Sequence, residues 1–548
     1  MLAKAIGGAG GGGYTSIDID FRDYSPAANG QKVSDAGITS GLATLTSASA
    51  LFVSGDVGKA CVGTGAGVAG ANLHTTIAGY TNPTTITLTA NASTTVSGAN
   101  FSWGTDDTAK LQSAIDAANT AGNGRIIIPR NRYYFTGVLN WKRCTLSGAA
   151  HGPFEAAGSN PGKFTVGPTF MITNESTAFL TDASWHEPKI ENIIFYYPNQ
   201  VAPSASTPVV YPWTIDITNA GVAGVVVRNC LFVNSYNAIN SLGGRHLFAN
   251  LNIGSLNRGI VIDGCRDTIR INDIQFTPFW DTVNALGGGQ PIDTWTYANA
   301  TVLEIYSADL VFIQNLFALG KNIGIYISDS ATYTTPYSNS YGIGTNINLD
   351  GMNFGIKVKS TNPTASIDWE FNGLQLGGSA TGDTAVWLEA GGVSAPNVRI
   401  NGGALWGTWP VPINVEAGKC RHVNVRGLSD VFRNFGNTDT TPSVIQGTLF
   451  KANNTLARTI TSFDDGYTGQ EIETVFTTAN TTLNETGNIR LTGATTMTPA
   501  AGDSHRFRFD GTNWWHIGGG ADLATFGIDG GAFTDTYVST ANVDGGAF

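Results

Sequence analysis

Residues 227–232 read VRNCLF, and residues 248–253 read FANLNI. Both stretches follow the order apolar, any, Asn, apolar, any, apolar. Asn, like Asp and Gly, tolerates a left-handed backbone at modest cost, so the third position suits a bend. Because side chains alternate along a strand, the apolar residues on both sides of that bend point to one interior. Each stretch therefore predicts a strand, a one-residue bend and a second strand.

The same pattern recurs at IENIIF (190–195), INDIQF (271–276), IQNLFA (313–318), LDGMNF (349–354), FNGLQL (371–376) and, more weakly, INGGAL (400–405) and VRGLSD (425–430). Its third positions are Asn192, Asn229, Asn250, Asp273, Asn315, Gly351, Gly373, Gly402 and Gly427. A base period of about 22 residues with longer additions is typical of a solenoid. No helical pattern separates the units, which excludes βαβ crossovers. We predict an all-β, right-handed, single-stranded parallel β-helix of roughly nine to twelve coils.

A second set of alternating strands lies between these units. Its members are GIVIDG (259–264), VLEIYS (302–307), GIYISD (324–329), GIKVKS (355–360), AVWLEA (385–390) and PINVEA (412–417). Each has apolar residues at every second position, as expected of a strand with one buried side. Together the two sets predict two faces of the coil.

Composition limits the classes of function. The chain has 548 residues, a formal net charge of −11 and 10% aromatic residues, which fits a folded protein and argues against a general nucleic-acid binder. Its five cysteines are scattered without a CxxC pair, so we expect buried small side chains, with neither disulfides nor a metal site. No run is apolar enough for a membrane span or a signal peptide, so an extracellular role would need another route, such as a virus particle.

A helix is predicted over residues 106–121. Asp106 and Asp107 supply acceptors and negative charge at its start, and Leu111, Ile115 and Ala118 form one apolar stripe. Because the first coil of a solenoid must be covered, we expect this helix to cap it, with the two aspartates in a structural role.

The remaining segments divide the chain into domains. We predict a glycine-rich leader (1–20), a small β domain (21–102), the β-helix (103–450), a C-terminal β cap (451–520) and a tail (521–548) that contains DGGAF twice. The small domains at both ends are expected from short alternating stretches bounded by turn residues.

The stretches GTDDTAKLQSAIDAA (104–118) and GRIIIPRNRYYFTG (124–137) resemble the opening segment of the pectate-lyase-like parallel β-helix proteins. That group includes the tailspikes and tail fibres of bacteriophages, and the resemblance covers roughly residues 100–430. Asn131 stands where the usual pattern has Gly, and Asn also tolerates a positive φ. The resemblance implies a homotrimer on a virion tail, beside other tail proteins, that recognises a bacterial surface polysaccharide without a cofactor. It implies no particular activity, because the group contains lyases, hydrolases, epimerases and proteins without known activity.

Stacking of equivalent positions suggests a carboxylate pair. With bends at Gly351 and Gly373, Asp350 and Glu370 lie on adjacent coils one pleat apart, roughly 8 Å across the diagonal. This is within the ~6.5–9.5 Å range of inverting glycosidases, and Asp368 is an alternative acid. Arg399 and Gln314 are candidates to hold sugar hydroxyls or carboxylates. The alternative is that these are ordinary solvated side chains.

Two long insertions are rich in aromatic residues. Residues 277–299 contain Trp280 and Trp295, and residues 328–344 contain Tyr333 and Tyr337. Aromatic rings on loops beside a flat sheet are suited to stacking on sugars, although such loops also pack against neighbouring subunits. Trp387 on the second face is a further candidate for sugar binding.

We therefore expect a phage tailspike or tail fibre that binds a surface polysaccharide and depolymerises it by hydrolysis. One alternative is an adhesin or structural tail protein with the same fold and no catalysis. Another is a polysaccharide lyase, for which Lys357, Lys359 and Glu389 are the best residues.

Overall fold

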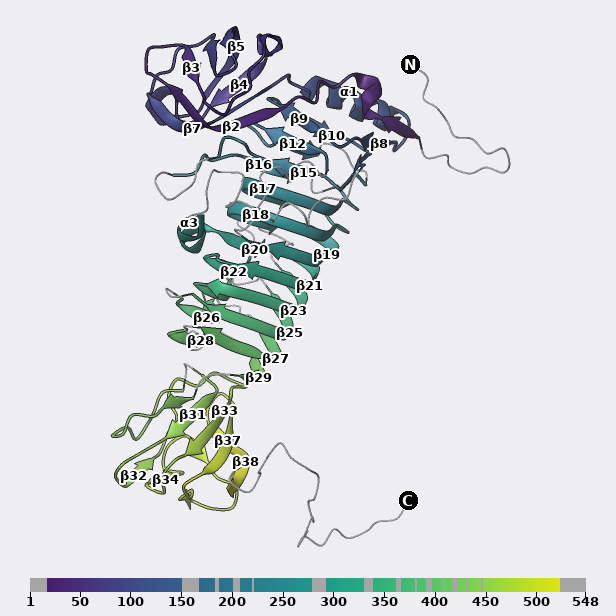
Figure 1. The fold of residues 1–548 in the computed structure, drawn as a ribbon. Coiled ribbons are helices and arrows are strands. Elements are labelled where there is room, and N and C mark those ends of the chain that lie inside the picture. The colour runs from purple at the N-terminus through teal and green to yellow at the C-terminus, as the bar shows by residue number, and fades with distance from the viewer. Residues whose placement is uncertain are drawn as a thin grey trace, which may run out of the picture.

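The computed structural model describes residues 17–149, 167–182, 187–200, 207–218, 221–277, 292–329, 339–360, 366–379, 382–390, 397–407, 409–415, 422–429, 432–444 and 447–522. Over these residues the chain forms a long stack of parallel strands with a small β barrel at one end and a second β domain at the other (Figure 1). The predicted all-β parallel β-helix is confirmed by the strand pairing.

The coil has three faces. Face 1 consists of β1 (Asp18–Asp20), β8 (Arg125–Ile128), β11 (Thr145–Gly148), β14 (Lys189–Glu191) and the first parts of β17 (Val226–Ser241), β18 (Leu247–Ile262), β19 (Cys265–Phe276), β21 (Ala308–Leu319), β23 (Ser340–Met352), β25 (Ile367–Gly378), β27 (Asn397–Gly407) and β29 (His422–Ser429). Face 2 consists of β9 (Arg132–Phe135), β12 (Thr169–Ile172), β15 (Ile194–Tyr196) and the parts of the long strands that follow the bend.

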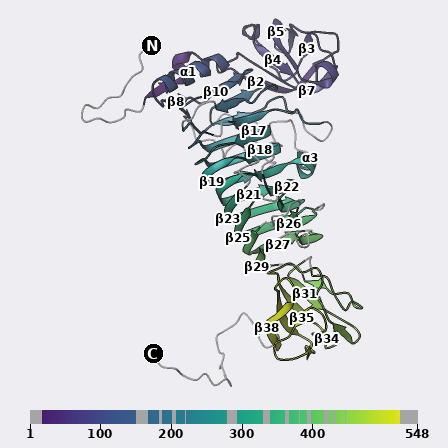
Figure 2. The same ribbon diagram turned by 180° about the vertical axis from the view of Figure 1, so that it is seen from behind.

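Face 3 consists of β10 (Leu139–Trp141), β13 (Leu180–Asp182), β16 (Trp213–Ile217), the ends of β17 and β18, and then β20 (Thr301–Ile305), β22 (Ile323–Ser328), β24 (Phe354–Ser360), β26 (Thr384–Ala390) and β28 (Val411–Val415). Every pairing in the coil is parallel, and Figure 2 shows the same stack from behind. Inward side chains of all three faces join one core, which includes Ile271, Ile313 and Phe371. Cys61, Cys144, Cys230 and Cys265 are buried, as expected of small core side chains, and Cys420 lies outside the described residues.

The bend between faces 1 and 2 has a left-handed backbone in successive coils. Asn229, Asn250 and Asn315 have φ values of 54°, 50° and 55°. Their side chains form a ladder along the stack, with amide donation from Asn229 to Asn192 (3.1 Å), from Asn250 to Asn229 (2.8 Å), from Asn315 to Asp273 (2.8 Å) and from Asn346 to Asn315 (2.7 Å). The third position of the repeat thus bends the chain and also ties each coil to its neighbour.

One predicted bend is wrong. Thr345 pairs with Gln314 on one side and with Asn372 on the other, so the bend of β23 is at Asn346 and not at Gly351. Both residues have a positive φ, 54° at Asn346 and 62° at Gly351. The sequence therefore offers two suitable bends five residues apart, and only the register with the neighbouring coils selects one of them.

Helix α1 (Thr108–Thr120) places Leu111, Ile115 and Ala118 in the core of the first coils. The carboxylate of Asp106 accepts the backbone N–H of Thr108 (3.0 Å), but the side chain of Asp107 does not bond to the helix. Asp107 instead accepts the N–H groups of Ala27 (2.7 Å) and Ala28 (3.0 Å) and so fastens the preceding segment to the helix start. The expectation that both aspartates cap the helix is therefore wrong for Asp107.

The chain before α1 contributes to two structures. β1, in the predicted leader, pairs with β8 as the first rung of face 1. A closed barrel follows, formed by β2 (Gln31–Ile38), β3 (Thr44–Thr46), β4 (Ala60–Gly63), β5 (Leu73–Asn82), β6 (Thr85–Leu88) and β7 (Val96–Gly104), with short 3-10 turns η1 (Phe21–Tyr24), η2 (Ser54–Asp56) and η3 (Val68–Gly70). Asn131 does not have the positive φ that the resemblance suggested for its position.

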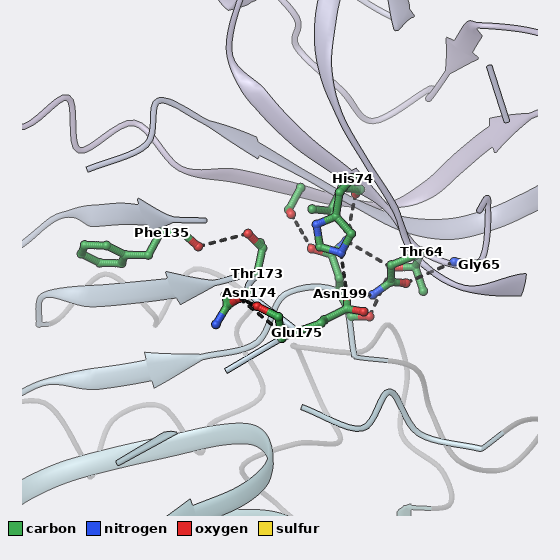
Figure 3. Close-up of polar contacts among 12 residues, drawn as sticks. Thr64, Gly65, His74, Phe135, Thr173, Asn174, Glu175 and Asn199 are labelled. Carbon is green, nitrogen blue, oxygen red and sulfur yellow. Dashed lines mark hydrogen bonds and ion pairs between the residues drawn. The ribbon is translucent and has the colours of Figure 1, made fainter. Parts of the chain in front are cut away.

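A polar seam joins the barrel to the first coils (Figure 3). Buried Asn199 donates to the Val62 carbonyl (2.9 Å) and the Thr64 hydroxyl (3.1 Å). His74 contacts the Glu175 carboxylate at 3.0 Å, beside the residues of the turn after β12 (Figure 3). These bonds attach the barrel to the sides of the coils.

The C-terminal domain begins before the predicted boundary at residue 450, which falls inside β31. One sheet has the order β30 (Arg433–Asn434), β31 (Leu449–Ala452), β33 (Glu471–Phe476), β37 (Asp503–Phe509), β38 (Trp514–Asp522) and β35 (Ile489–Arg490). A smaller sheet contains β32 (Arg458–Ile460), β34 (Thr481–Asn484) and β36 (Thr496–Met497). This domain has its own core around Phe463 and Trp514.

The ladder predicts an unusual order of substitutions at Asn250. Asn250→Gly loses the bond to Asn229, about 1 kcal/mol, but keeps easy access to a positive φ. Asn250→Ala loses the same bond and must also hold a left-handed backbone, at a further cost of about 1–2 kcal/mol. We expect Asn250→Ala to lower the thermal midpoint more than Asn250→Gly, as measured by calorimetry.

Asn272 on the next coil is the control, because it has no positive φ. There the Gly substitution should lower the thermal midpoint more than the Ala substitution. The same order at both positions would contradict the interpretation.

Candidate functional site

The outward side of face 3 carries a row of polar and aromatic side chains. Glu304 pairs with Tyr326, Tyr326 with Lys357, and Lys357 with Trp387, on four adjacent strands. Residues in register on neighbouring strands are about 4.8 Å apart, so these side chains form a continuous line along the stack. The strands position them rigidly because their inward neighbours, including Ile325, Ile356 and Val386, are fully buried.

Aromatic and cationic groups are in direct contact on the last two strands of this row, β24 and β26. The Lys357 ammonium lies 3.9 Å from the ring centroid of Trp387 and 5.2 Å from that of Phe354. The two rings are 5.5 Å apart. A cation held against an aromatic face is an attractive arrangement that fixes the orientation of both groups.

Two ammonium groups share one carboxylate beside this cluster. Glu389 accepts from Lys359 at 2.6 Å and lies 3.4 Å from the Lys357 ammonium. Burial acts to raise the pKa of Glu389, but the hydrogen bond from Lys359 and the charges of both lysines outweigh it, so the pKa is lowered. The trio therefore carries one net positive charge, which favours an anionic or hydroxyl-rich ligand.

A second polar cluster continues the surface toward β16. Arg258 donates to Glu304 at 2.7 Å, and the Tyr306 hydroxyl donates to the same carboxylate at 2.7 Å. The guanidinium lies 5.3 Å from the ring centroid of Trp213, and Tyr306 meets Tyr326 edge to face at 5.9 Å. Burial, followed by the charge of Glu304, raises the pKa of Tyr306 well above its ordinary value, so its hydroxyl stays protonated.

The two long insertions leave the coil at opposite edges of face 3. One lies between β19 and β20, where α3 (Ile292–Asn299) leads into β20, and the other lies between β22 and β23. Trp280, Tyr333 and Tyr337 are outside the described residues. The Trp295 indole donates to the Leu256 carbonyl at 3.1 Å, which ties α3 to β18. Its predicted contact with sugar remains a prediction.

The predicted proximity of Asp350 and Glu370 is wrong. Glu370 pairs with Ile343 of the preceding coil, whereas Asp350 pairs with Leu319 beyond the bend, on face 2. The cause is the bend at Asn346, which moves Asp350 four residues past the corner. Burial raises the pKa of Asp350, but Glu370 is not its neighbour.

Face 1 instead brings together Asp368, Glu370 and Arg399. The Arg399 guanidinium donates to Asp368 at 2.8 Å and more weakly to Glu370 at 3.4 Å. Asn397 donates to Asp368 (3.0 Å), and Asn401 donates to Glu370 (3.2 Å). Gln314 is exposed in the same column as Asn372 and Asn401, but two and three coils away from them.

Sequence reasoning missed several exposed or half-buried groups. Trp213, Arg258 and Tyr306 extend face 3. Trp213 and Arg258 lie in the column that leads through Thr301 and Ile323 to Phe354, and Tyr306 directly follows β20. Trp406 on face 2 is 42% exposed, and its ring lies over Gly377, where a Cβ would be only 2.8 Å from it. A glycine opposite a tryptophan on the next coil was the available signal for that contact.

Fold and surface together define a β-helical protein with an aromatic and charged outer surface on face 3. Comparison of the sequence with family models and with curated proteins found no match. Among solved structures, the A-module of mannuronan C-5 epimerase AlgE6 of Azotobacter vinelandii is similar, at 12% identity over 66% of this chain and 91% of that chain, with a TM-score of 0.34.

Two further solved structures are similar to the chain. The GH87 α-1,3-glucanase catalytic unit of Streptomyces thermodiastaticus has 13% identity over 73% of this chain and 88% of that chain, with a TM-score of 0.29. The tailspike gp61 of Pseudomonas phage phi297 has 11% identity over 77% of this chain and 66% of that chain, with a TM-score of 0.20. At these values the likenesses carry no argument about function.

No helix within the described ranges is long and apolar enough to cross a membrane. Within the same ranges, no group of three or more His, Cys, Asp or Glu side chains is arranged to hold a metal ion.

The shared carboxylate of face 3 predicts a pH-dependent effect of Glu389→Gln. The pKa of Glu389 is lowered in the folded protein, so its contribution to stability is present above its unfolded pKa and is lost as pH falls through the lowered value. At about pH 7 the variant should lose about 0.5–1 kcal/mol, and the loss should be smaller at about pH 3, because Glu389 takes up a proton as the pH falls through its lowered pKa.

Thermal midpoints at the two pH values measure this difference. Asp23→Asn, at an exposed carboxylate, serves as the control and should change neither midpoint. An equal loss for Glu389→Gln at both pH values would show that packing, and not the charge, is responsible.

Proposed function

We propose that the chain is a polysaccharide-recognition protein that binds a bacterial surface glycan along face 3. The observation that carries the proposal is the in-register row Glu304, Tyr326, Lys357 and Trp387, extended by Phe354 and the Glu389 trio. Rings held edge-on or flat on a rigid sheet suit the apolar faces of sugars, and fixed charges suit hydroxyl and carboxylate groups. A ligand repeating along the stack would meet equivalent positions on successive coils.

The proposed setting is the tail of a bacteriophage. The opening segment (104–137) resembles that of pectate-lyase-like tailspikes, and this resemblance supports a right-handed winding, a homotrimer and contact with other tail proteins. In this setting the β-helix would be the part of the particle that recognises its host.

Binding to purified capsular, O-antigen and exopolysaccharides tests the proposal. For any polysaccharide bound, Trp387→Ala should weaken binding about tenfold or more, equivalent to ~1.4 kcal/mol, because the ring and the orientation of Lys357 are both lost. Trp406→Ala is the matched control, since it removes an exposed tryptophan from face 2. Equal loss in both variants, or none in Trp387→Ala, would reject face 3 as the binding surface. Biolayer interferometry gives the dissociation constants.

Hydrolysis of the bound glycan is a second candidate function, favoured by Asp368 and Glu370. They are two residues apart on one side of β25, roughly 6.6 Å along the strand, which is near the carboxyl separation of inverting glycosidases. Arg399 contacts both, so a substrate would have to displace or share this guanidinium.

The activity test follows reducing ends and ultraviolet absorbance together during incubation with a bound polysaccharide. Hydrolysis predicts reducing ends without absorbance, reduced at least 100-fold in Asp368→Asn and Glu370→Gln because each removes one partner of the acid–base pair. Asp350→Asn should retain activity, because Asp350 lies on another face. Absorbance from an unsaturated product would instead indicate a lyase, with Lys357, Lys359 and Glu389 as its candidates. Binding without either product would leave an adhesin.

A further inference from the structure

The outer side of the C-terminal sheet carries an exposed tryptophan between arginines. Trp515 on β38 pairs with Arg508 on β37 and with Arg490 on β35, and Arg508 pairs with Glu471 on β33. The opposite side of the same strands is packed, because Ile489, Phe507 and Trp514 are fully buried. The row of Glu471, Arg508, Trp515 and Arg490 therefore faces away from the core of this domain.

Trp515 is held in one orientation without being buried. Its side chain is 50% exposed, and its indole N–H donates to Asp510 Oδ2 at 2.6 Å. Asp510 is itself fixed, since its Oδ1 accepts the N–H groups of Asn513 (2.7 Å) and Thr512 (2.8 Å). The hydrogen bonds from Asn513, Trp515 and Thr512 lower the pKa of Asp510, which keeps this acceptor ionised. An exposed ring with a fixed orientation loses little entropy when a flat ligand stacks on it.

The cations beside this ring are accessible. Arg506 is exposed and has no ion pair among the described residues. Arg506 pairs with Gly518, so no side chain of residue 518 covers it. The Arg506 guanidinium lies 3.9 Å from the place that a Cβ of residue 518 would occupy. Arg508 is 49% exposed, and its Nε is 3.9 Å from Glu471, a distance at which a surface ion pair contributes little.

The glutamates of the same surface are less accessible to a ligand than these arginines. Glu473, in register with Arg506, accepts the Ser504 hydroxyl at 2.7 Å. Glu471 is 28% exposed in its side chain. The groups that a ligand would meet first are therefore the indole face and two guanidiniums, with the exposed Asp510 carboxylate confined to the N–H edge of the indole, although the whole chain has a net charge of −11.

We propose that this surface is a second saccharide-binding site, specific for a pyranose that carries a carboxylate. The apolar face of the sugar stacks on the Trp515 indole, and the carboxylate accepts hydrogen bonds from the Arg506 and Arg508 guanidiniums. The site is separate from face 3, because it belongs to a domain with its own core. Its existence does not depend on polysaccharide binding by the β-helix.

The test is hydroxyl-radical footprinting of the full chain, read by mass spectrometry at the peptides containing Trp515 and Trp387. The probes are a galacturonate hexasaccharide and the same oligosaccharide fully methyl-esterified, which has no charge. We expect the acidic probe to protect Trp515 and the ester to leave it unprotected. The double variant Arg506→Ala/Arg508→Ala should abolish this protection while Trp515 remains as reactive as in the parent protein without ligand.

Two control variants separate this site from other effects. Lys451→Ala removes a cation of the same domain that lies over Phe432, and it should leave the protection of Trp515 unchanged. Trp387→Ala should also leave it unchanged, so failure of the face 3 proposal would be visible independently. In calorimetric titrations of the Trp387→Ala protein, adding Trp515→Ala should weaken binding of the acidic probe at least tenfold.

Three results would overturn the proposal. The first is no protection of Trp515 by the acidic probe, and the second is equal protection by the ester, which would remove the role of the arginines. The third is a Trp515 that is unreactive before any ligand is added, because another subunit or another segment of the chain would then cover the surface.

Discussion

The structure depends on one backbone constraint, the left-handed residue that turns the coils between Asn192 and Gly402 from face 1 to face 2. Such a conformation is costly for most residues, and Asn, Asp and Gly adopt it most readily. Where Asn is used, its amide also bonds to the equivalent residue of the adjacent coil, as from Asn250 to Asn229 and from Asn346 to Asn315. The same position therefore fixes both the corner and the register. Since a slip by one residue would turn every inward side chain outward, this register determines the core and the surface together.

The register also explains how a functional surface arises without any local motif. Tyr326, Lys357 and Trp387 are separated by about 30 residues in sequence, but they are neighbours because each lies at the same place in its coil. The cation–aromatic contact of Lys357 with Trp387 and the sharing of Glu389 by two lysines both follow from this alignment. Insertions leave at the corners, where they lengthen a coil without disturbing the columns. Segments at the two edges of face 3 are therefore free to vary while the row between them stays in place.

Most of the fold could be predicted from the sequence, because the bend pattern and the alternation on face 3 are local and repeat. The prediction failed where two residues of the right type, Asn346 and Gly351, competed for one corner, since only contacts with neighbouring coils distinguish them. That single error displaced Asp350 and created the false pair with Glu370. The proximity of Asp368 and Glu370 could be predicted from the sequence, because residues two apart on a strand point to the same side. The prediction that the Asp107 side chain caps the helix was also wrong. Its carboxylate accepts the N–H groups of Ala27 and Ala28 instead, and these lie about 80 residues away in the sequence.

The distribution of charge limits how the two proposed surfaces would find an acidic glycan. A net charge of −11 repels a polyanion at long range, so electrostatic steering does not favour the encounter. The favourable charges are local: the Lys357 and Lys359 ammonium groups beside Glu389, and the guanidiniums beside Trp515. At physiological ionic strength such charges act over about 8 Å, which is little more than the depth of one sugar. Selectivity must therefore arise after contact, from rings and charges whose positions are already fixed by the strands. For a ligand with many repeats this is sufficient, because weak contacts repeated along one chain reinforce each other once the first is made.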